Sequence, residues 1–373
     1  MNVSLYTLSV LLSMNESPFI CSRMPFSLNM FHISFKKSFS ALYYSQNVHN
    51  MQICDSTFHN TLKVPIFVSE TALRIYESYS EFGSSGTIII QKCRFVKCNS
   101  ISAAGSCFHI SAVSACYLIV DSCVFQSCIC THKTSSMRSD LSSSAFLFVG
   151  TNFSLKNGCF MDMYGNGWGF IFYSRVPNNQ KNLVNNVYAI NCSSSSTGFG
   201  YTLDYGDSIV ENYNATRIVS PGDSIAGHYG GYESSWASLR FSQIHTCSGN
   251  SLTGPAMSPS LGPSDSYYIN IINNTANYMI ISWLRQFIFK NMVFSMNTGA
   301  VSGQNDIYLD SYFDNNKIGA ITMSRGCVTN SLTSAYTIQM NEFCENWAKE
   351  ITYNSSPKSR YILFCFSPIF NVL

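Results

Sequence analysis

Short apolar runs with alternating polar positions recur along most of the chain. The clearest copies are Ile88–Cys98 and Leu118–Cys128, which share the pattern apolar-x-apolar, two spacers, Cys-x-Phe-x-x-Cys. Every landmark of the second copy lies 30 residues after its counterpart, so the two segments are equivalent units of an internal repeat. Runs of this length and alternation predict short strands, and no long stretch has a helical period. The landmarks are Cys93, Phe95 and Cys98 in the first unit and Cys123, Phe125 and Cys128 in the second.

Weaker copies of this unit follow, in which the spacing is kept but the last residue changes. One copy is assigned to Tyr201 and Leu203, leading to Ile209 and Asn212. The other pairs at the Phe and final positions include Phe160 with Met163, Phe294 with Asn297, Phe313 with Asn316, and Phe343 with Asn346. Because these positions recur while the loops vary in length, we expect them to form columns inside a stack of coils.

A second kind of segment lies between these units, each a short apolar run that follows a small residue. Examples are Gly105–Ile110, Ala145–Val149 and Gly169–Tyr173, and each predicts a further strand. Two or three strands per repeat cannot bury their apolar faces alone, but stacked coils can pair equivalent strands about 4.8 Å apart. The sequence therefore predicts an all-β, right-handed parallel β-helix of about ten coils, with Phe95 and Phe125 buried and adjacent.

The domain organisation expected from this pattern has three parts. Residues 1–45 repeat poorly and are expected to be a weak signal segment or a cap, and residues 46–373 form the β-helix. A stretch rich in Ser, Gly and Pro around 248–266 predicts a long loop that leaves the stack. The apolar C-terminal stretch, 361–373, is too short to cross a bilayer as a helix, so we interpret it as a final strand.

Composition narrows the possible partners. The chain is 46% hydrophobic and only 11% charged, with a net charge of +2 and no run of Lys or Arg. That balance excludes electrostatic binding to nucleic acid. The 15 cysteines and several N-x-[ST] sequons permit a secreted or cell-surface location, although membrane attachment stays open.

The repeated cysteines raise a metal-site hypothesis. Cys93, Cys98, Cys123 and Cys128 could supply four thiolates to a tetrahedral zinc ion. The competing interpretation is a packing column, because later coils place Met or Asn at the equivalent position, and this interpretation is favoured. We therefore expect no metal and no other cofactor, while disulfides between stacked coils, such as Cys93 with Cys123, stay open.

The asparagines and acidic residues suggest different roles. Asn297, Asn316 and Asn346 are expected to be structural, since Asn tolerates left-handed backbone and its side chains can hydrogen-bond along a stack. A β-helix hydrolase or lyase would need clustered carboxylates. The nearest acidic set is interpreted as loop residues, and no catalytic residue is assigned. These acidic residues, with one histidine in an unusual glycine-rich context, are Asp204, Asp207, Glu211, Asp223 and His228.

The FxxN segments, together with Gly299–Val301 and Gly319–Ile321, resemble the FxxN and GGA[ILV] elements of polymorphic outer-membrane-protein repeats. They also resemble cysteine-rich β-helix surface proteins of protists, often described as pectin-lyase-like. The first Gly of GGA is missing here, and early coils carry FxxC. The resemblance implies adhesion or surface display without catalysis, with a surface glycan or protein as partner. The alternatives are a polysaccharide-active lyase or glycoside hydrolase and, third, a structural zinc protein.

Overall fold

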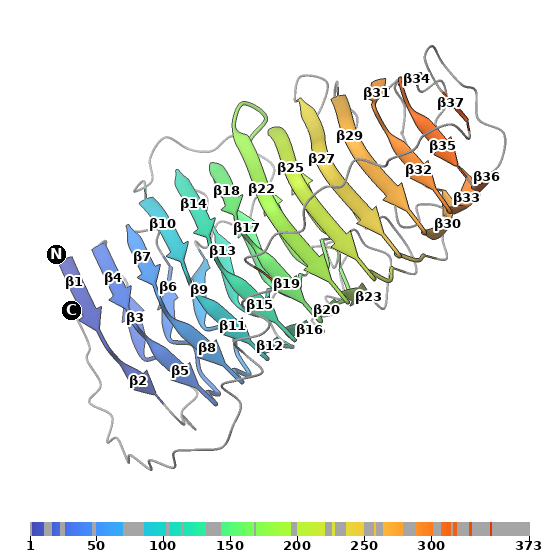
Figure 1. Ribbon diagram of the computed structural model, residues 1–373. Coiled ribbons are helices and arrows are strands. Elements are labelled where there is room, and N and C mark those ends of the chain that lie inside the picture. The colour runs from blue at the N-terminus through green and yellow to red at the C-terminus, as the bar shows by residue number, and fades with distance from the viewer. Residues whose placement is uncertain are drawn as a thin grey trace.

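The computed structural model confirms the predicted parallel β-helix. Every strand pairing in the described part of the chain is parallel, and equivalent strands of successive coils lie side by side in chain order (Figure 1). The structure describes residues 2–10, 17–22, 27–46, 50–69, 86–101, 105–112, 115–131, 143–167, 169–194, 200–220, 226–227, 236–249, 257–258, 264–278, 288–300, 307–314, 316–318, 328–329 and 344.

One coil illustrates the path of the chain. Strands β10 (Gly86–Gln91) and β11 (Arg94–Val96) lie in a 21-stranded sheet, β12 (Asn99–Ser100) in a four-stranded sheet, and β13 (Phe108–Ser111) in a seven-stranded sheet. The next coil begins at β14 (Cys116–Asp121), which pairs with β10 in register. This coil thus contributes two strands to the large sheet and one strand to each of the other two sheets.

The three principal sheets contain most of the strands. The large sheet comprises β1 (Asn2–Tyr6), β2 (Ser9–Val10), β4 (Ser27–Phe31), β5 (Ser34–Lys36), β7 (Met51–Cys54), β8 (Thr57–His59), β10, β11, β14, β15 (Val124–Gln126), β18 (Asn152–Lys156), β19 (Cys159–Met161), β22 (Lys181–Ile190), β25 (Asp207–Thr216), β27 (Ala237–His245), β29 (Ser264–Ile272), β31 (Ile288–Lys290), β32 (Val293–Ser295), β34 (Ile307–Leu309), β35 (Tyr312–Asp314) and β37 (Val328–Thr329). The seven-stranded sheet comprises β3 (Ile20–Ser22), β6 (Tyr43–Ser45), β9 (Ile66–Ser69), β13, β17 (Phe146–Val149), β21 (Phe172–Arg175) and β24 (Tyr201–Asp204). The four-stranded sheet comprises β12, β16 (Ile129–Cys130), β20 (Tyr164–Gly165) and β23 (Ser193–Ser194).

Two small sheets complete the described strands. The first contains β26 (Ala226–Gly227) and β28 (Met257–Ser258), and the second contains β30 (Thr275–Tyr278), β33 (Thr298–Ala300) and β36 (Lys317–Ile318). Strand β28 lies within the range 248–266 that the sequence assigned to a loop. The described residues of the segment 1–45 also belong to the stack, since β1 pairs with β4 and β2 with β5 in register. The described strands therefore belong to thirteen successive coils, more than the ten or so expected from the sequence. Twelve of them begin at β1, β4, β7, β10, β14, β18, β22, β25, β27, β29, β31 and β34, and β37, which pairs with β35, belongs to the next.

Left-handed backbone at two recurring corners shapes each coil. Lys92 (φ 51°) lies between β10 and β11, and Lys97 (φ 52°) follows β11, and their counterparts in other coils share this conformation. The first corner contains Thr7, His32, Asp55, Lys92, Ser122, Asn157, Asn186, Asn212, Phe241, Tyr268, Asn291 and Asp310. The second contains Lys37, Asn60, Lys97, Ser127, Asp162, Asn191, Arg217, Thr246, Asn273 and Met296. Such backbone is costly for residues other than glycine, so its recurrence shows that the stack imposes it.

An aromatic column fills the interior beside these corners. Phe95 and Phe125 are fully buried, are opposite each other on parallel strands, and stack with ring centroids 5.2 Å apart. Phe160 continues the stack at 4.8 Å from Phe125. In the following coils alanine and isoleucine occupy this position. Phenylalanine occupies it again at Phe294 and Phe313, whose ring centroids are 4.8 Å apart. Phe343 lies outside the described residues.

The residue after the second corner points inward in each coil, and these residues form a column that we call the corner column. Cys98, Cys128, Met163, Cys192, Cys247 and Asn297 occupy it and are buried. Asn297 is not itself left-handed, in contrast to the sequence interpretation, because that backbone lies one residue earlier, at Met296. Asn346 lies outside the described residues.

One coil was misassigned from the sequence. Tyr201 and Leu203 lie on β24, in the seven-stranded sheet, and do not begin a coil in the large sheet. Asn212 belongs to the first corner, and the residue equivalent to Cys192 is Ile218. The cause is a two-residue connection, Tyr205–Gly206, which joins the apolar strands of two sheets with almost no spacer.

Candidate functional site

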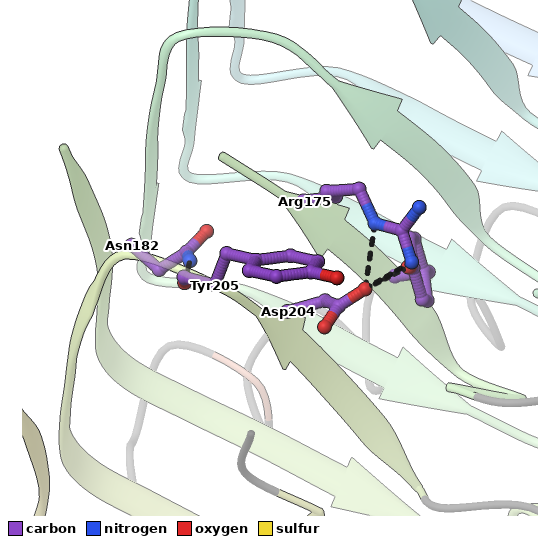
Figure 2. Close-up of polar contacts among 5 residues, drawn as sticks. Arg175, Asn182, Asp204 and Tyr205 are labelled. Atoms are coloured by element: carbon purple, nitrogen blue, oxygen red, sulfur yellow. Dashed lines mark hydrogen bonds and ion pairs between the residues drawn. The ribbon is translucent and has the colours of Figure 1, made fainter. Parts of the chain in front are cut away.

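A polar cluster lies on the outer face of the seven-stranded sheet. Tyr173 and Arg175 lie two residues apart on β21, so their side chains share one face of the sheet. Asp204 is the last residue of the neighbouring strand β24. Asp204 Oδ2 accepts a hydrogen bond from the Tyr173 hydroxyl at 2.7 Å and from Arg175 Nε at 2.6 Å, and it also pairs with Arg175 Nη2 (Figure 2). The guanidinium carbon of Arg175 lies 5.3 Å from the ring centre of Tyr205, so the cation also contacts an aromatic ring.

The corner beside this cluster is rigidly held. Tyr205 (φ 59°) and Gly206 (φ 63°) are both left-handed, and a Cβ at position 206 would lie 2.4 Å from Val176 and 2.7 Å from the Gln180 carbonyl oxygen. Only glycine fits there. Asn182, which is fully buried beneath the corner, donates from Nδ2 to the Tyr205 carbonyl at 2.9 Å (Figure 2). This network fixes the position of Asp204 and Tyr205.

The interior beneath the cluster departs from the apolar pattern of the other coils. Asn182 is in register with Phe153 of the preceding coil and with Ser208 of the following one. Ser174 donates to Asn182 Oδ1 at 2.7 Å, so the buried amide is hydrogen-bonded on both sides. Burying such groups in place of phenylalanine costs free energy even when they are paired, and such departures from pattern are expected at functional sites.

The local environment sets the protonation of these groups. Burial, together with the Asp204 carboxylate, raises the pKa of Tyr173 well above its usual value, so the phenol is protonated and donates. Burial opposes the charge of Arg175, but Tyr173 and Asp204 outweigh it and raise its pKa. The cluster therefore combines an acceptor carboxylate and a permanent cation with a phenol that is fully buried beside them. Arg175 and Asp204 are about one-fifth exposed, with side-chain values of 17% and 20%.

A ladder of aromatic side chains runs along the same sheet face. Tyr44 on β6 stacks on Phe67 on β9 at 5.4 Å, and Phe67 stacks on His109 on β13 at 4.7 Å. This column continues through Leu147 to Tyr173, because β17 and β21 pair in the same register. We call Tyr44, Phe67 and His109 the aromatic ladder. The side chains of all three residues are partly exposed.

Sequence reasoning missed Tyr173 and Arg175 and misinterpreted the acidic set. Asp204 is on β24 and Asp207 and Glu211 are on β25, so none of the three is a loop residue. Glu211 lies in the large sheet and pairs with Arg240 at 3.5 Å, away from the cluster. The available signal was the 29-residue separation of Arg175 and Asp204, which is about one coil. Asp223 and His228 lie outside the described residues.

The cysteines assigned to a zinc hypothesis separate into two corners. Cys93 and Cys123 follow the first corner, and Cys98 and Cys128 follow the second; all four are buried. Cys93 and Cys123 have free thiols, so the disulfide left open for them does not form in this structure. Cys98 and Cys128 instead approach Cys107. Burial raises the pKa of Cys107 and Cys128 well above the usual thiol value.

Within the described residues, a disulfide joins Cys159 on β19 to Cys344. It ties a C-terminal residue to the outside of the large sheet, where Val124, Met161 and Tyr188 pack around it. The two cysteines are 185 residues apart, and the sequence pattern gave no sign of this pairing because it is not repeated.

Comparisons with known proteins add one finding. No protein-family model matches the sequence, and no curated protein matches it. The chain is similar to the crystal structure of the periplasmic alginate epimerase AlgG, with 12% identity, a TM-score of 0.45, and coverage of 85% of this chain and 79% of that chain. That structure is of an enzyme, so the expectation that this chain lacks catalysis is contradicted and we withdraw it. At this identity and TM-score the likeness assigns no activity. Among the described residues, no helix is long and apolar enough to span a membrane.

Proposed function

We propose that this chain is a polysaccharide-active β-helix enzyme that binds a uronate-containing polymer on the outer face of the seven-stranded sheet. The observation that carries the proposal is the contact of the Asp204 carboxylate with both the Tyr173 phenol and the Arg175 guanidinium. A carboxylate base and a cation are groups that can remove a proton α to a sugar carboxylate, and the protonated phenol holds the base in place.

Each residue has a defined part in that reaction. Arg175 binds the substrate carboxylate, since a planar guanidinium suits this partner, and it stabilises the negative charge that develops there. The substrate carboxylate competes with Asp204 for the cation, which frees Asp204 to accept the proton from the adjacent carbon. The resulting electron pair then either expels the leaving group at the next carbon, giving an unsaturated sugar, or is protonated from the opposite face, giving an epimer. Water supplies the proton to the leaving oxygen or to the carbon, and the fully buried Tyr173, which donates to Asp204 Oδ2, positions the carboxylate.

The aromatic ladder supports a polymeric substrate. Tyr44, Phe67 and His109 form a partly exposed strip in line with the cluster, in which the rings stack on one another and turn their edges outward. Apolar C–H groups of sugar rings can pack along such a strip, while polar groups fix orientation. The Cys159–Cys344 disulfide supports a location outside the cytoplasm, because oxidising compartments preserve such bonds.

The test is turnover of a panel of polyuronates, including alginate and polygalacturonate, by the purified chain. Unsaturated products are followed by ultraviolet absorbance, and epimers by NMR of the polymer. We expect turnover of at least one polymer, and a loss of about 10²–10⁴-fold in Asp204→Asn, the range typical of a general base.

A matched control separates the site from general surface effects. Glu211→Gln removes a second carboxylate that pairs with an arginine, Arg240, near the ring of Tyr267 in the large sheet. We expect that variant to retain full turnover. Absence of turnover across the panel, or equal turnover by Asp204→Asn and the parent, contradicts the proposal. Binding to a polymer without turnover would favour adhesion through the aromatic ladder.

A further inference from the structure

Three thiols meet in the interior beside the second corner. The sulfur atoms of Cys98, Cys107 and Cys128 all lie within 4.8 Å of one another, and all three residues are fully buried. Cys107 Sγ is 3.5 Å from Cys128 Sγ, a contact without a covalent bond. Cys98 and Cys128 occupy the corner column of adjacent coils, and Cys107 comes from the segment before β13.

The corner column itself does not require three sulfurs here. At the positions equivalent to Cys98 the preceding coils have Ser38 and Thr61, both fully buried. The residues equivalent to Cys107 in neighbouring coils, Pro65 and Ala145, carry no sulfur. Cys107 thus adds a third thiol beside the two that Cys98 and Cys128 place in adjacent coils of the corner column.

A further polar side chain lies next to this cluster. The hydroxyl of Thr61 is buried and is close enough to Cys98 to hydrogen-bond to its sulfur. Thr61 lies directly below Cys98 in the column, since the Asn99 N–H donates to the Thr61 carbonyl at 2.8 Å.

We propose that Cys98, Cys107 and Cys128 form a binding site for a soft thiophilic metal ion, Cu(I). Each thiol loses its proton as its sulfur bonds the metal, and the ion remains Cu(I) throughout. This site is separate from the one proposed for polysaccharide and does not depend on it.

The number of ligands selects the ion. Structural zinc sites use four ligands, but within the described residues no histidine, carboxylate or further cysteine joins the three sulfurs. Thiolates select soft ions such as Cu(I), which is stable with three sulfur ligands in a trigonal arrangement. The small movement needed to bring three sulfurs from 4.8 Å or less to bonding positions around one ion lies within side-chain rotation.

The experiment compares copper binding by the full chain, by three cluster variants and by one control variant. Reduced protein is refolded anaerobically with Cu(I) in the presence of bathocuproine disulfonate, which removes weakly held copper, and retained copper is measured by mass spectrometry. We expect the Cys107→Ser variant to retain one copper fewer per chain than the parent. Cys192→Ser, in the same column but outside the cluster, should retain as much as the parent. X-ray absorption at the copper edge should show three sulfur neighbours.

The design keeps the proposal open to refutation if one variant folds poorly. Cys98→Thr reproduces the residue that the preceding coil places at the same position, and Cys128→Ser introduces the residue found at position 38, so both should fold. Equal copper retention by the parent and all three cluster variants overturns the site. Retention of zinc in place of copper, in the same variant-dependent manner, overturns the assignment to Cu(I).

Discussion

Asn297 offers the sharpest test of how the corner column stabilises the stack. Its Oδ1 accepts from the Asn274 backbone N–H at 3.0 Å and from Asn274 Nδ2 at 3.1 Å. Its Nδ2 donates to the Ile271 carbonyl at 2.7 Å and to Asn316 Oδ1 at 3.0 Å. Asn297 is fully buried, so water does not replace these partners when the side chain is truncated.

Asn297→Ala therefore leaves the buried Asn274 N–H without a partner, whereas the Ile271 carbonyl loses its side-chain donor but stays in the β29–β32 pairing. One orphaned backbone group costs about 1–3 kcal/mol, so the substitution should destabilise these coils by roughly that amount. Because a stack is stabilised by nearest neighbours, the loss should stay within the adjacent coils. Asn297→Cys should cost less, since the chain itself uses cysteine in this column.

Hydrogen exchange measured by mass spectrometry reports this loss coil by coil. Peptides containing the Asn274 amide should exchange on the order of a hundredfold faster in Asn297→Ala, whereas peptides from β10 and β14 should not change. Asn185→Ala is the control, because that side chain donates to Glu211 at the surface at 3.1 Å. The reasoning is refuted if Asn274 keeps its protection in Asn297→Ala, or if Asn185→Ala gives the same acceleration.

Three further predictions concern stability. Met296→Gly should stabilise the chain by up to about 1 kcal/mol in chemical denaturation, since this exposed residue is left-handed at φ 54° and glycine adopts that backbone freely; a marked loss of stability would contradict this. Burial raises the pKa of Cys192 from 9.0 to about 12 and that of Tyr43 from 10.0 to about 12. Their neutral forms therefore stabilise the fold fully below pH 9, and this contribution should be lost as pH rises toward 12; a thermal melt independent of pH across this range would refute it. Cys344→Ser should lower the melting temperature, because the Cys159–Cys344 bond closes a 185-residue loop whose entropy is worth on the order of 5 kcal/mol; an unchanged melting temperature would show that the bond adds no stability.

The parallel β-helix could be predicted from the sequence because stacking repeats the same interior environment in every coil. Phe95 and Phe125 lie at the same place in adjacent coils, so their 30-residue spacing carries the register directly. Residues at the same corner differ in side-chain chemistry from coil to coil, as Lys92 and Ser122 do, so their left-handed backbone was not recognised from the pattern. The coil around Tyr201 was misassigned because the Tyr205–Gly206 connection removes the spacer that separates the strands elsewhere.

The candidate site was harder to predict for the same physical reason. Outward positions are not repeated, since each coil meets solvent or a ligand there and no neighbouring coil constrains its chemistry. Arg175 and Asp204 are therefore single residues whose contact depends on coil length, which loops between strands make variable.

The repeat nevertheless indicates the site indirectly, because polar residues replace apolar ones at interior positions of the coils beneath it. Phenylalanine at position 153 gives way to Asn182 and then Ser208 in successive coils, and these polar residues support the corner that ends in Tyr205. A stack built only for stability has no reason to exchange a buried ring for an amide that needs two partners. Here the buried amide of Asn182 holds the corner that positions the carboxylate, guanidinium and phenol on the outer face. The coil in which this interior column changes from apolar residues to Asn182 is thus also the coil in which the outer face gains its chemistry.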